Sequence, residues 1–297
     1  MQAVVLIANP FASRVSEERL AAVERELARV AELSIVMTEH PRHATELASE
    51  ACRGGCDAVA VFSGDGGFNE ALNGLEADMP IGFLPGGGAS VLSRALGLPA
   101  DPAAAARQLA EAIEQGRTRR IAVGRVNGRR FAFSAGIGLD AEAVRRVDEM
   151  GRARDGRRPG DLAFVLAVLQ TLAAHGGHIE PSLEVKGLGR AAFAFVANAS
   201  PYTYAKGLPL PIAPEANFEL GLDVVAPVRV RRRSLLRTAY SVLAGRPREG
   251  SILYGHDLDR IEIVCDHPMP LHADGEDLGD VEEALFEAER GAVAVLA

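Results

Sequence analysis

The segment Ala58–Leu75 reads AVAVFSGDGGFNEALNGL and joins an apolar run to a glycine-rich turn and a helix-like continuation. An apolar run of this kind is typical of a strand that is buried on both faces of a parallel sheet. The turn leads into a helix start, where unpaired backbone N–H groups and the helix dipole attract anions. The segment therefore predicts a strand–loop–helix unit of an α/β fold with an anion-binding loop.

Two further loops of the first half occupy the same position after a predicted strand. NPFASR follows the apolar run that begins at Ala3, and PGGGAS follows the run IGFLP that begins at Ile81. The carboxyl ends of parallel strands meet at one edge of an open sheet, and ligands bind outside that edge. A single glycine-rich turn is often only a tight turn, but three such loops together predict a phosphate-binding edge.

Strand and helix signals alternate up to about residue 120, with Ser16 and Asp101 as expected helix N-caps. Short β-like runs separated by Gly, Pro, Asn or Asp then dominate, which is typical of an antiparallel sandwich or barrel. Helical segments are expected at about 161–174 and 234–244 within this second half. We therefore predict an N-terminal parallel α/β domain, residues 1–124, and a C-terminal antiparallel β-sandwich domain, residues 125–297.

Composition excludes several classes of protein. The chain of 297 residues has a formal net charge of -8, which argues against a non-specific nucleic-acid binder. Its three cysteines are an odd number, which fits free thiols in a reducing compartment. The start MQAVVLIANP lacks the basic region of a signal peptide, and no apolar stretch is long enough to span a bilayer. We therefore expect a cytoplasmic protein.

Two common nucleotide-binding motifs are absent from the sequence. There is no G-x-x-x-x-G-K-[ST] motif of a P-loop protein. There is also no G-x-G-x-x-G after the first predicted strand, so a Rossmann dinucleotide site is not expected. If the glycine-rich loops bind phosphate, they form neither of these two kinds of site.

The motifs resemble those of the diacylglycerol kinase catalytic family, which includes bacterial lipid kinases and sphingosine kinases. Ser63–Leu75 is similar to the family signature G-G-D-G-T-x-N-E-V-x-N-G-L, and Leu84–Pro99 is similar to its second glycine loop. The remaining matches are Asn9-Pro10, Thr38 with His43-Ala44, Ala135–Ala141 as A-G-x-G-[FL]-D-A, and His272–Glu276, which ends in D-G-E. These matches follow in order over nearly the whole chain.

The resemblance implies a fold, a reaction and two small-molecule requirements. It implies a nucleotide-binding α/β domain, a β-rich lipid-acceptor domain and an active site formed by both. It further implies an ATP-dependent lipid kinase that uses Mg²⁺ and transfers the γ-phosphate to a lipid hydroxyl. The expected acceptor is diacylglycerol, which would give phosphatidic acid, a product of phospholipid biosynthesis.

The resemblance also implies roles for individual residues. Asp65, at the tip of the first glycine turn, is expected to be catalytic and to bind Mg²⁺, since a bare carboxylate there would repel phosphate; the alternative is a turn cap. Glu276 is the expected general base, or else a solvated turn acid. Asp140 and Asp274 are tentative acceptor or metal residues, with helix capping and turn formation as alternatives. Nucleotide contacts are expected from Asn9, Pro10, Phe11, Thr38, Ser63, Gly64, Gly66, Gly67, Asn69, Glu70, Gly86, Gly87, Gly88 and Ser90.

The sequence departs from the family pattern at several positions. Gly67 stands where the signature has Thr, while Gly88 and Ser90 replace the Thr and Asn of the second loop. Many family members carry D-D-G with a structural Mg²⁺ site where this chain has Glu219–Gly221, which puts that second metal in doubt.

Contact with a membrane surface is predicted from the middle of the chain. Six arginines lie between Arg145 and Arg158, and the apolar segment DLAFVLAVLQTLAA follows at Asp161. A basic stretch beside an apolar helix suits anionic lipid at the inner membrane face; the alternative is a solvated loop followed by a core helix. Two other functions remain open, a kinase of another lipid or a soluble alcohol, and a nucleotide-binding regulator without catalysis. A homodimer is also left open.

Overall fold

The computed structural model describes residues 2–76, 78–88, 90–150, 161–205, 208–231 and 251–297. The chain forms two compact units, Met1–Ile121 together with Gly291–Ala297, and Ala122–Arg290. The predicted domain boundary at residue 124 lies near this division, but the last seven residues return to the first unit. The helix predicted at 234–244 and the arginines at 152–158 lie outside the described residues.

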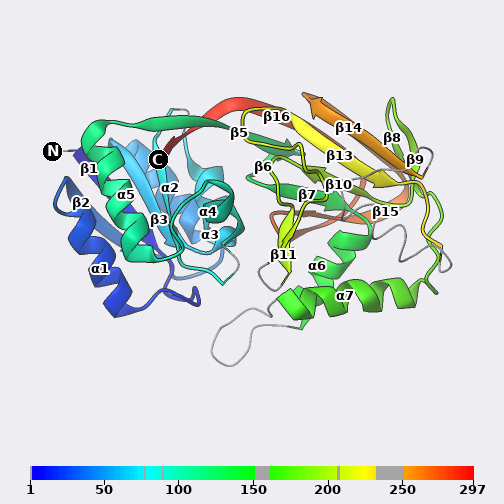
Figure 1. The fold of residues 1–297 in the computed structure, drawn as a ribbon, viewed down its shortest axis with the longest axis horizontal. Helices are drawn as coiled ribbons and strands as arrows, with labels where there is room; N and C mark the ends of the chain where they lie inside the picture. Colours follow the sequence, from blue (N-terminus) through cyan, green and yellow to red (C-terminus); the bar gives the residue numbers. More distant parts are fainter. Residues whose placement is uncertain (1, 77, 89, 151–160, 206–207, 232–250) are drawn as a thin grey trace. The chain divides into compact units, whose positions relative to one another are not determined.

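The first unit is built on a parallel sheet with the strand order β2–β1–β3–β4 (Figure 1). Its strands are β1 (Gln2–Ala8), β2 (Ala31–Met37), β3 (Ala58–Ser63) and β4 (Ile81–Pro85). In the register of these pairs Ala8 lies beside Phe62, and Ser63 lies beside Pro85. The carboxyl ends of the strands therefore meet at one edge, as the sequence predicts.

Helices cover both faces of this sheet. They are α1 (Glu17–Leu27), α2 (His43–Arg53), α3 (Asp65–Gly74), α4 (Val91–Ala95) and α5 (Pro102–Gln115). One apolar cluster joins Leu6 of β1 and Phe62 of β3 to residues of α1 and α5. Val59 and Val61 alternate with the β3 residues of that cluster and are also fully buried, and α3 packs against β3. Burial on both faces explains why β3 is a continuous apolar run.

The N-caps predicted for two helices are present in the structure. Ser16 has extended backbone dihedrals, and its side chain accepts a hydrogen bond from the N–H of Arg19 at 3.3 Å. Asp101 accepts one from the N–H of Ala104 at 2.9 Å, with Pro102 as the first residue of α5. Both side chains satisfy an N–H group that the helix itself leaves without a partner.

The second unit is an antiparallel sheet structure with the strand order β14–β13–β10–β7–β15–β16. These strands are β7 (Ser134–Ile137), β10 (Ala194–Ala197), β13 (Leu222–Pro227), β14 (Ile252–Leu258), β15 (Arg260–Ala273) and β16 (Glu276–Leu296). Short hairpins add β5 (Thr118–Val126) with β6 (Arg129–Phe131), and β8 (Leu183–Val185) with β9 (Gly189–Ala191). A separate pair joins β11 (Thr203–Ala205) and β12 (Leu208–Leu210).

The core of the second unit lies between the strands named above. Phe131, Phe286 and Leu271 belong to one large buried cluster, in which the two phenylalanine rings meet edge to face. The helices of this unit are α6 (Leu139–Glu149) and α7 (Asp161–Ala174), which pack against each other. The predicted fold class, a parallel α/β domain and an antiparallel β-sandwich-like domain, is confirmed.

Three details differ from the sequence-based expectation. The run RRFAFSAG is divided between β6 and β7. The closing run GAVAVLA belongs to β16 and pairs in parallel with β4, with Val295 beside Ile81. Helix α6 was not predicted as an element, because its polar residues, such as Arg145 and Arg146, conceal a short apolar stripe at Ala143, Val144 and Val147.

Candidate functional site

The loops after β1 and β4 are joined by main-chain contacts at the carboxyl edge of the parallel sheet. Asn9, directly after β1, accepts a hydrogen bond from the N–H of Phe11 through its Oδ1 at 2.9 Å. The N–H of Arg14 donates to the carbonyl of Gly86 at 2.8 Å, and the N–H of Gly86 donates to the carbonyl of Ser63 at 2.7 Å. The loops that follow β1, β3 and β4 therefore form one connected structure.

Close approach of the main chain explains why glycines are needed here. An ideal Cβ on Gly87 would lie 2.8 Å from the Cα of Gly64. A Cβ on Gly86 would lie 2.8 Å from a methyl group of Val15 and 3.0 Å from the carbonyl oxygen of Ser63. Contacts below about 3 Å are not tolerated without a shift of the backbone. The glycine-rich composition is thus required for packing of the loops as well as for exposing N–H groups to a ligand.

The carboxylate of Asp65 links the two glycine loops. Asp65 is the first residue of α3, and its two oxygens accept hydrogen bonds of 3.0 Å each from the N–H groups of Val91 and Leu92 at the start of α4. Asp65 therefore caps the start of α4, whereas the alternative interpretation of the sequence was a cap of its own glycine turn.

The carboxylate of Asp65 also fits a Mg²⁺ ion. A carboxylate offers about four acceptor positions in all, more than the N–H groups of Val91 and Leu92 use. Asp65 is also the one acidic residue in the three loops, residues 9–16, 63–67 and 86–90. The residues present therefore fit a metal that has one protein carboxylate and takes its other ligands from phosphate and water, which is how Mg²⁺ binds in many nucleotide sites.

The other expected nucleotide residues lie around these loops. Thr38 is buried directly after β2, and its N–H donates to the carbonyl of Ala8 at 2.9 Å. Glu70 accepts from the N–H of Ala44 at 3.3 Å and so connects α3 to the start of α2. Ser90 donates to the carbonyl of Gly87 at 3.0 Å and stabilises its own loop. Asn69 is buried, Phe11 is exposed, and Gly66 and Gly88 lie on open surface.

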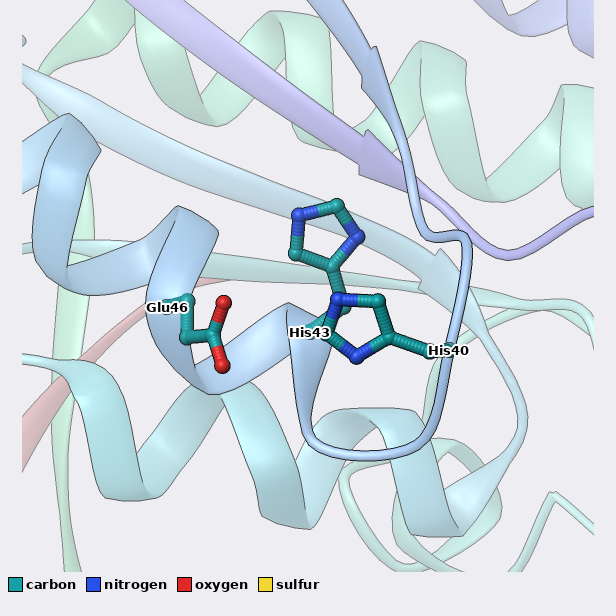
Figure 2. Close-up of side chains that lie close together, drawn as sticks. All are labelled: His40, His43 and Glu46. Atoms are coloured by element: carbon teal, nitrogen blue, oxygen red, sulfur yellow. The ribbon is translucent and has the colours of Figure 1, made fainter.

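Figure 2 shows a cluster of His40, His43 and Glu46 at the start of α2, whose ligand atoms lie within 4.8 Å of one another. The two imidazole rings are stacked, with centroids 4.4 Å apart and planes within 12° of parallel. Imidazole binds a metal in the plane of the ring at about 2.0–2.1 Å, so stacked rings cannot both face one ion. The Nδ1 of His43 also accepts from the N–H of Glu39 at 3.0 Å, which places the proton on Nε2. In this arrangement the cluster does not form a metal site.

In the second unit, Glu276 is the first residue of β16, directly after the turn from β15. Its carboxylate forms an ion pair with Arg129 of β6. Asp274 is buried, and its oxygens accept from the N–H groups of residues 132, 133 and 134 at 2.6–3.1 Å. Asp274 therefore fixes the turn that presents Glu276, and the structure gives it a turn-forming role.

Asp140 belongs to a buried polar network that the sequence did not predict. Its Oδ2 accepts from the hydroxyl of Tyr202 at 2.6 Å and lies 2.7 Å from the Nε2 of His272. Its Oδ1 accepts from the N–H of Ala141 at 2.9 Å within α6. Burial, followed by the charge of Asp140, raises the pKa of the Tyr202 hydroxyl well above its ordinary value. The network connects α6 to β15 and to the segment before β11.

The acids next to Glu219–Gly221, where many family members carry a structural Mg²⁺ site, are held by an arginine. The N–H of Gly221 donates to Asp257 at 2.7 Å, and the guanidinium of Arg290 pairs with Asp257 at 2.8 Å and with Asp259 at 2.6 Å. An ideal Cβ on Gly221 would lie 2.7 Å from a terminal nitrogen of Arg290. A side-chain cation therefore already neutralises the acids next to Glu219–Gly221, and these residues do not fit a structural Mg²⁺.

Arg129 and Tyr202 were not predicted from the sequence, and His272 was part of the match that ends in D-G-E but was given no role there. Arg129 stands in an arginine-rich hairpin, where nothing local singles it out. Tyr202 and His272 lie 70 positions apart in the chain. His272 lies two residues before Asp274, the first residue of the D-G-E element. This closeness was the one signal in the sequence that His272 lies near the site.

Comparison with known proteins covers both units. Residues 3–126 match the diacylglycerol kinase catalytic domain, and residues 133–297 match the YegS C-terminal NAD kinase beta sandwich-like domain. A protein of Streptococcus pneumoniae serotype 4 named “Putative lipid kinase” is 34% identical over 115 residues, which are 38% of this chain and 38% of that protein. An uncharacterized protein of Synechocystis is 26% identical over 305 residues, 92% of this chain and 65% of that protein. The chain thus spans less than two thirds of both relatives.

Solved structures share the fold. A protein described as “a putative diacylglycerol kinase from Bacillus anthracis str. Sterne” has a TM-score of 0.74 and 22% identity, with 99% of this chain and 97% of that chain covered. A diacylglycerol kinase structure from the same organism has a TM-score of 0.72 and 21% identity, with 99% and 96% covered. No helix in the described parts of the chain has the length and apolar character needed to cross a bilayer. With both domain families matched over nearly its full length, the chain belongs to the diacylglycerol kinase catalytic-domain family.

Proposed function

We propose that this protein is an ATP-dependent lipid kinase that transfers the γ-phosphate of ATP to a lipid hydroxyl, with diacylglycerol as the acceptor and phosphatidic acid and ADP as the products. The observation that carries the proposal is the connection of three loops at one edge of a parallel sheet through Asp65 and the contact between Gly64 and Gly87. This edge exposes main-chain N–H groups without any lysine in the loops. Such an edge suits a phosphate chain better than a single anion.

In the first unit, the loops would bind and orient the nucleotide. Phosphoryl transfer depends mainly on positioning and on neutralising the charge that spreads over the phosphate oxygens. The N–H groups of Gly66 and Gly67 supply fixed positive dipoles at the start of α3. When bound, Mg²⁺ would supply further positive charge, and Asp65 is the residue that would hold it. The amide of Asn9 and the main chain of Gly86 complete the same edge.

In the second unit, Glu276 would act on the acceptor. We assign to it the role of general base, which takes the proton from the lipid hydroxyl as the oxygen attacks phosphorus. Arg129 holds the Glu276 carboxylate in place through their ion pair, and Asp274 fixes the preceding turn. Arg129 is therefore a positioning residue in this proposal.

Access to a lipid acceptor would use α7. The side chains of Leu166 and Leu169 are 47% and 54% exposed, whereas Ala167 between them is fully buried. Two large apolar side chains on the exposed side of an apolar helix suit insertion into the interface of a bilayer. We propose this surface as a peripheral membrane contact that places the protein beside its substrate.

The proposal is tested by ATP turnover in three arms, without acceptor, with glycerol and other soluble alcohols, and with detergent micelles that contain one lipid each. A lipid kinase gives turnover that depends on the lipid arm. Turnover with the soluble alcohols alone would assign the protein to a different acceptor class. Binding of ATP with no turnover in any arm would favour a nucleotide-binding regulator, which the changes at Gly67, Gly88 and Ser90 would then explain.

A further inference from the structure

Two positions of the first glycine loop differ from the family signature: one gains a hydroxyl group and the other loses one. The signature G-G-D-G-T begins with glycine and ends with a residue that has a hydroxyl group. This chain has S-G-D-G-G, so the hydroxyl group stands at Ser63 and the glycine stands at Gly67. The loop therefore keeps one hydroxyl group but carries it four residues earlier, on the last residue of β3 instead of in the first turn of α3.

The structure shows why the two changes belong together. An ideal Cβ on Gly67 would lie 2.1 Å from the Oγ and 2.8 Å from the Cβ of Ser63. Both distances are far below van der Waals contact, and both of the atoms met belong to a short, buried side chain. A threonine at position 67 and a serine at position 63 therefore exclude each other in this backbone, and Gly67 is required by Ser63.

The Ser63 hydroxyl is buried beside the start of α3 and has no partner among the described residues. The Ser63 side chain is only 2% exposed. A buried hydroxyl without a partner is destabilising, and proteins rarely keep one unless a water, an ion or a ligand completes it. The ideal Cβ on Gly67 would also lie 3.9 Å from the Nδ2 of Asn9. Two hydrogen-bonding side chains thus face the first turn of α3, a helix of 10 residues whose N–H groups favour an anion.

We propose that Ser63 supplies the side-chain hydrogen bond to a phosphate group of the bound nucleotide, and that Gly67 is the compensating change that makes this possible. The inference rests on the proposed function and makes it more specific. The hydroxyl is buried beneath Gly67 in this structure, so the contact requires a small displacement of the main chain at residues 66 and 67. Two consecutive glycines permit such a displacement at little conformational cost.

The competing explanation is that Ser63 only fills space beneath Gly67. The two explanations differ for Ser63→Ala, which keeps the Cβ and removes the hydroxyl. If the side chain only fills space, the variant has the affinity of the parent for ATP. If the hydroxyl contacts phosphate, the variant is as stable as the parent or more stable without nucleotide, because a buried unpaired group is gone, but its affinity for ATP falls.

The first experiment measures thermal unfolding of the full chain with Mg²⁺ and increasing ATP. We expect Ser63→Ala to weaken ATP binding by about 10-fold, the usual effect of losing a hydrogen bond to a charged group. Ser93→Ala is the matched control, since Ser93 is also 2% exposed and its Oγ also has no partner among the described residues. Its ATP affinity should equal that of the parent. Equal ATP affinity of parent and Ser63→Ala would overturn the inference.

The second experiment restores the family signature in steps. Gly67→Thr alone should lower the melting temperature by roughly 4–8 °C, because the new side chain collides with Ser63. Ser63→Gly alone should weaken ATP binding by about 10-fold, as in the alanine variant. The double variant Ser63→Gly/Gly67→Thr should recover both properties. A double variant that is no better than the worse single variant would overturn the proposed exchange.

Different results would show that the proposed function is wrong and that only the role of Ser63 is wrong. If the parent protein shows no stabilisation by ATP at millimolar concentration, the proposed function is wrong and this inference fails with it. If the parent is stabilised by ATP and Ser63→Ala is stabilised equally, the nucleotide site stands and only the role of Ser63 is wrong.

Discussion

The Oδ2 of Asp65 accepts a hydrogen bond of 3.0 Å from the main-chain N–H of Val91, and its Oδ1 accepts an equal one from Leu92. A residue expected to hold a metal thus also joins the two glycine loops of the sheet edge. The two roles are compatible because a carboxylate has more acceptor positions than these two bonds use. Substitutions at Asp65 should therefore affect the stability of the loops as well as catalysis.

Asp65→Asn should destabilise the protein by about 1–3 kcal/mol, because the amide NH₂ group would face a main-chain N–H group. The same variant should lose measurable kinase activity, since the metal loses its protein carboxylate. Urea denaturation and ATP turnover measure the two effects. Asp101→Asn is the control, because asparagine caps a helix about as well as aspartate. Stability of Asp65→Asn equal to that of the parent would contradict the role given to its two hydrogen bonds.

Arg129 should affect turnover without affecting ATP binding. Arg129→Gln removes the ion pair with Glu276, and misplacement of a catalytic group can reduce kcat by up to about 10²-fold. Arg129→Lys should recover part of the loss. Arg125→Gln serves as control, because Arg125 pairs with Glu289 in the same unit. The positioning role would be refuted by a kcat of Arg129→Gln equal to that of the control, or by a large change in the KM for ATP.

The turn that presents Glu276 should be stabilised by Arg145 in a pH-dependent manner. Arg145 binds both oxygens of Asp277 at 2.9 and 3.0 Å. Burial acts to raise the pKa of Asp277, but the hydrogen bonds from Arg145 and the N–H of Gly279 outweigh it and hold the pKa below its ordinary value. Because the pKa is lowered on folding, the pair stabilises the protein above about pH 3.9, and this contribution disappears as the pH falls through the folded-state value.

Arg145→Gln should therefore lower the melting temperature by roughly 2–4 °C at pH 7, corresponding to about 1 kcal/mol for a partly buried bidentate pair. The difference from the parent should shrink progressively as the pH is lowered below 4. Calorimetric melting across pH 3–7 measures it. A difference that is constant over this range would show that Arg145 acts through packing and not through the charge of Asp277.

The exposed side chains of α7 should contribute to membrane binding. Leu166→Ser/Leu169→Ser should reduce sedimentation with anionic vesicles by about 10-fold, since each leucine contributes at most about 1.5–3 kcal/mol on full burial. Leu188→Ser, in the turn between β8 and β9, is the control because Leu188 is also an exposed large apolar residue. Equal sedimentation of the double variant and the control would remove α7 from the proposed membrane surface.

The basic residues before α7 give a second, independent test of membrane contact. Arg152, Arg154, Arg157 and Arg158 lie outside the described residues, so this prediction rests on the sequence alone. Each cation near an anionic surface contributes about 1 kcal/mol or less. Replacing all four by Gln should weaken vesicle binding at low salt and have little effect at high salt. Unchanged binding at low salt would contradict the prediction.

The sequence predicts what local chemistry determines. Ser16 and Asp101 cap the expected helices because capping involves only the next few residues. The three glycine loops were found because parallel strands must end at one edge. Helix α7 was expected at residues 161–174 and begins and ends there, since its apolar composition is continuous.

The sequence does not predict contacts that depend on the register of distant strands. Glu276 and Arg129 are 147 residues apart, and any of several arginines could have paired with this acid. The network of Asp140, Tyr202 and His272 requires the pairing of β7 with β15. GAVAVLA has the composition of any buried strand, and nothing local indicates that it returns to β4.

In the proposed reaction, phosphate is transferred to a lipid hydroxyl with Glu276 as the base. The most direct measurement is the incorporation of radiolabelled γ-phosphate from ATP into diacylglycerol in mixed micelles, by the parent protein and by Glu276→Gln. The account predicts labelled phosphatidic acid with the parent and a loss on the order of 10²–10⁴-fold with Glu276→Gln, while both proteins bind ATP equally. Absence of labelled lipid with an ATP-binding parent would contradict the assignment of this acceptor, and near-normal transfer by Glu276→Gln would contradict the assignment of the base.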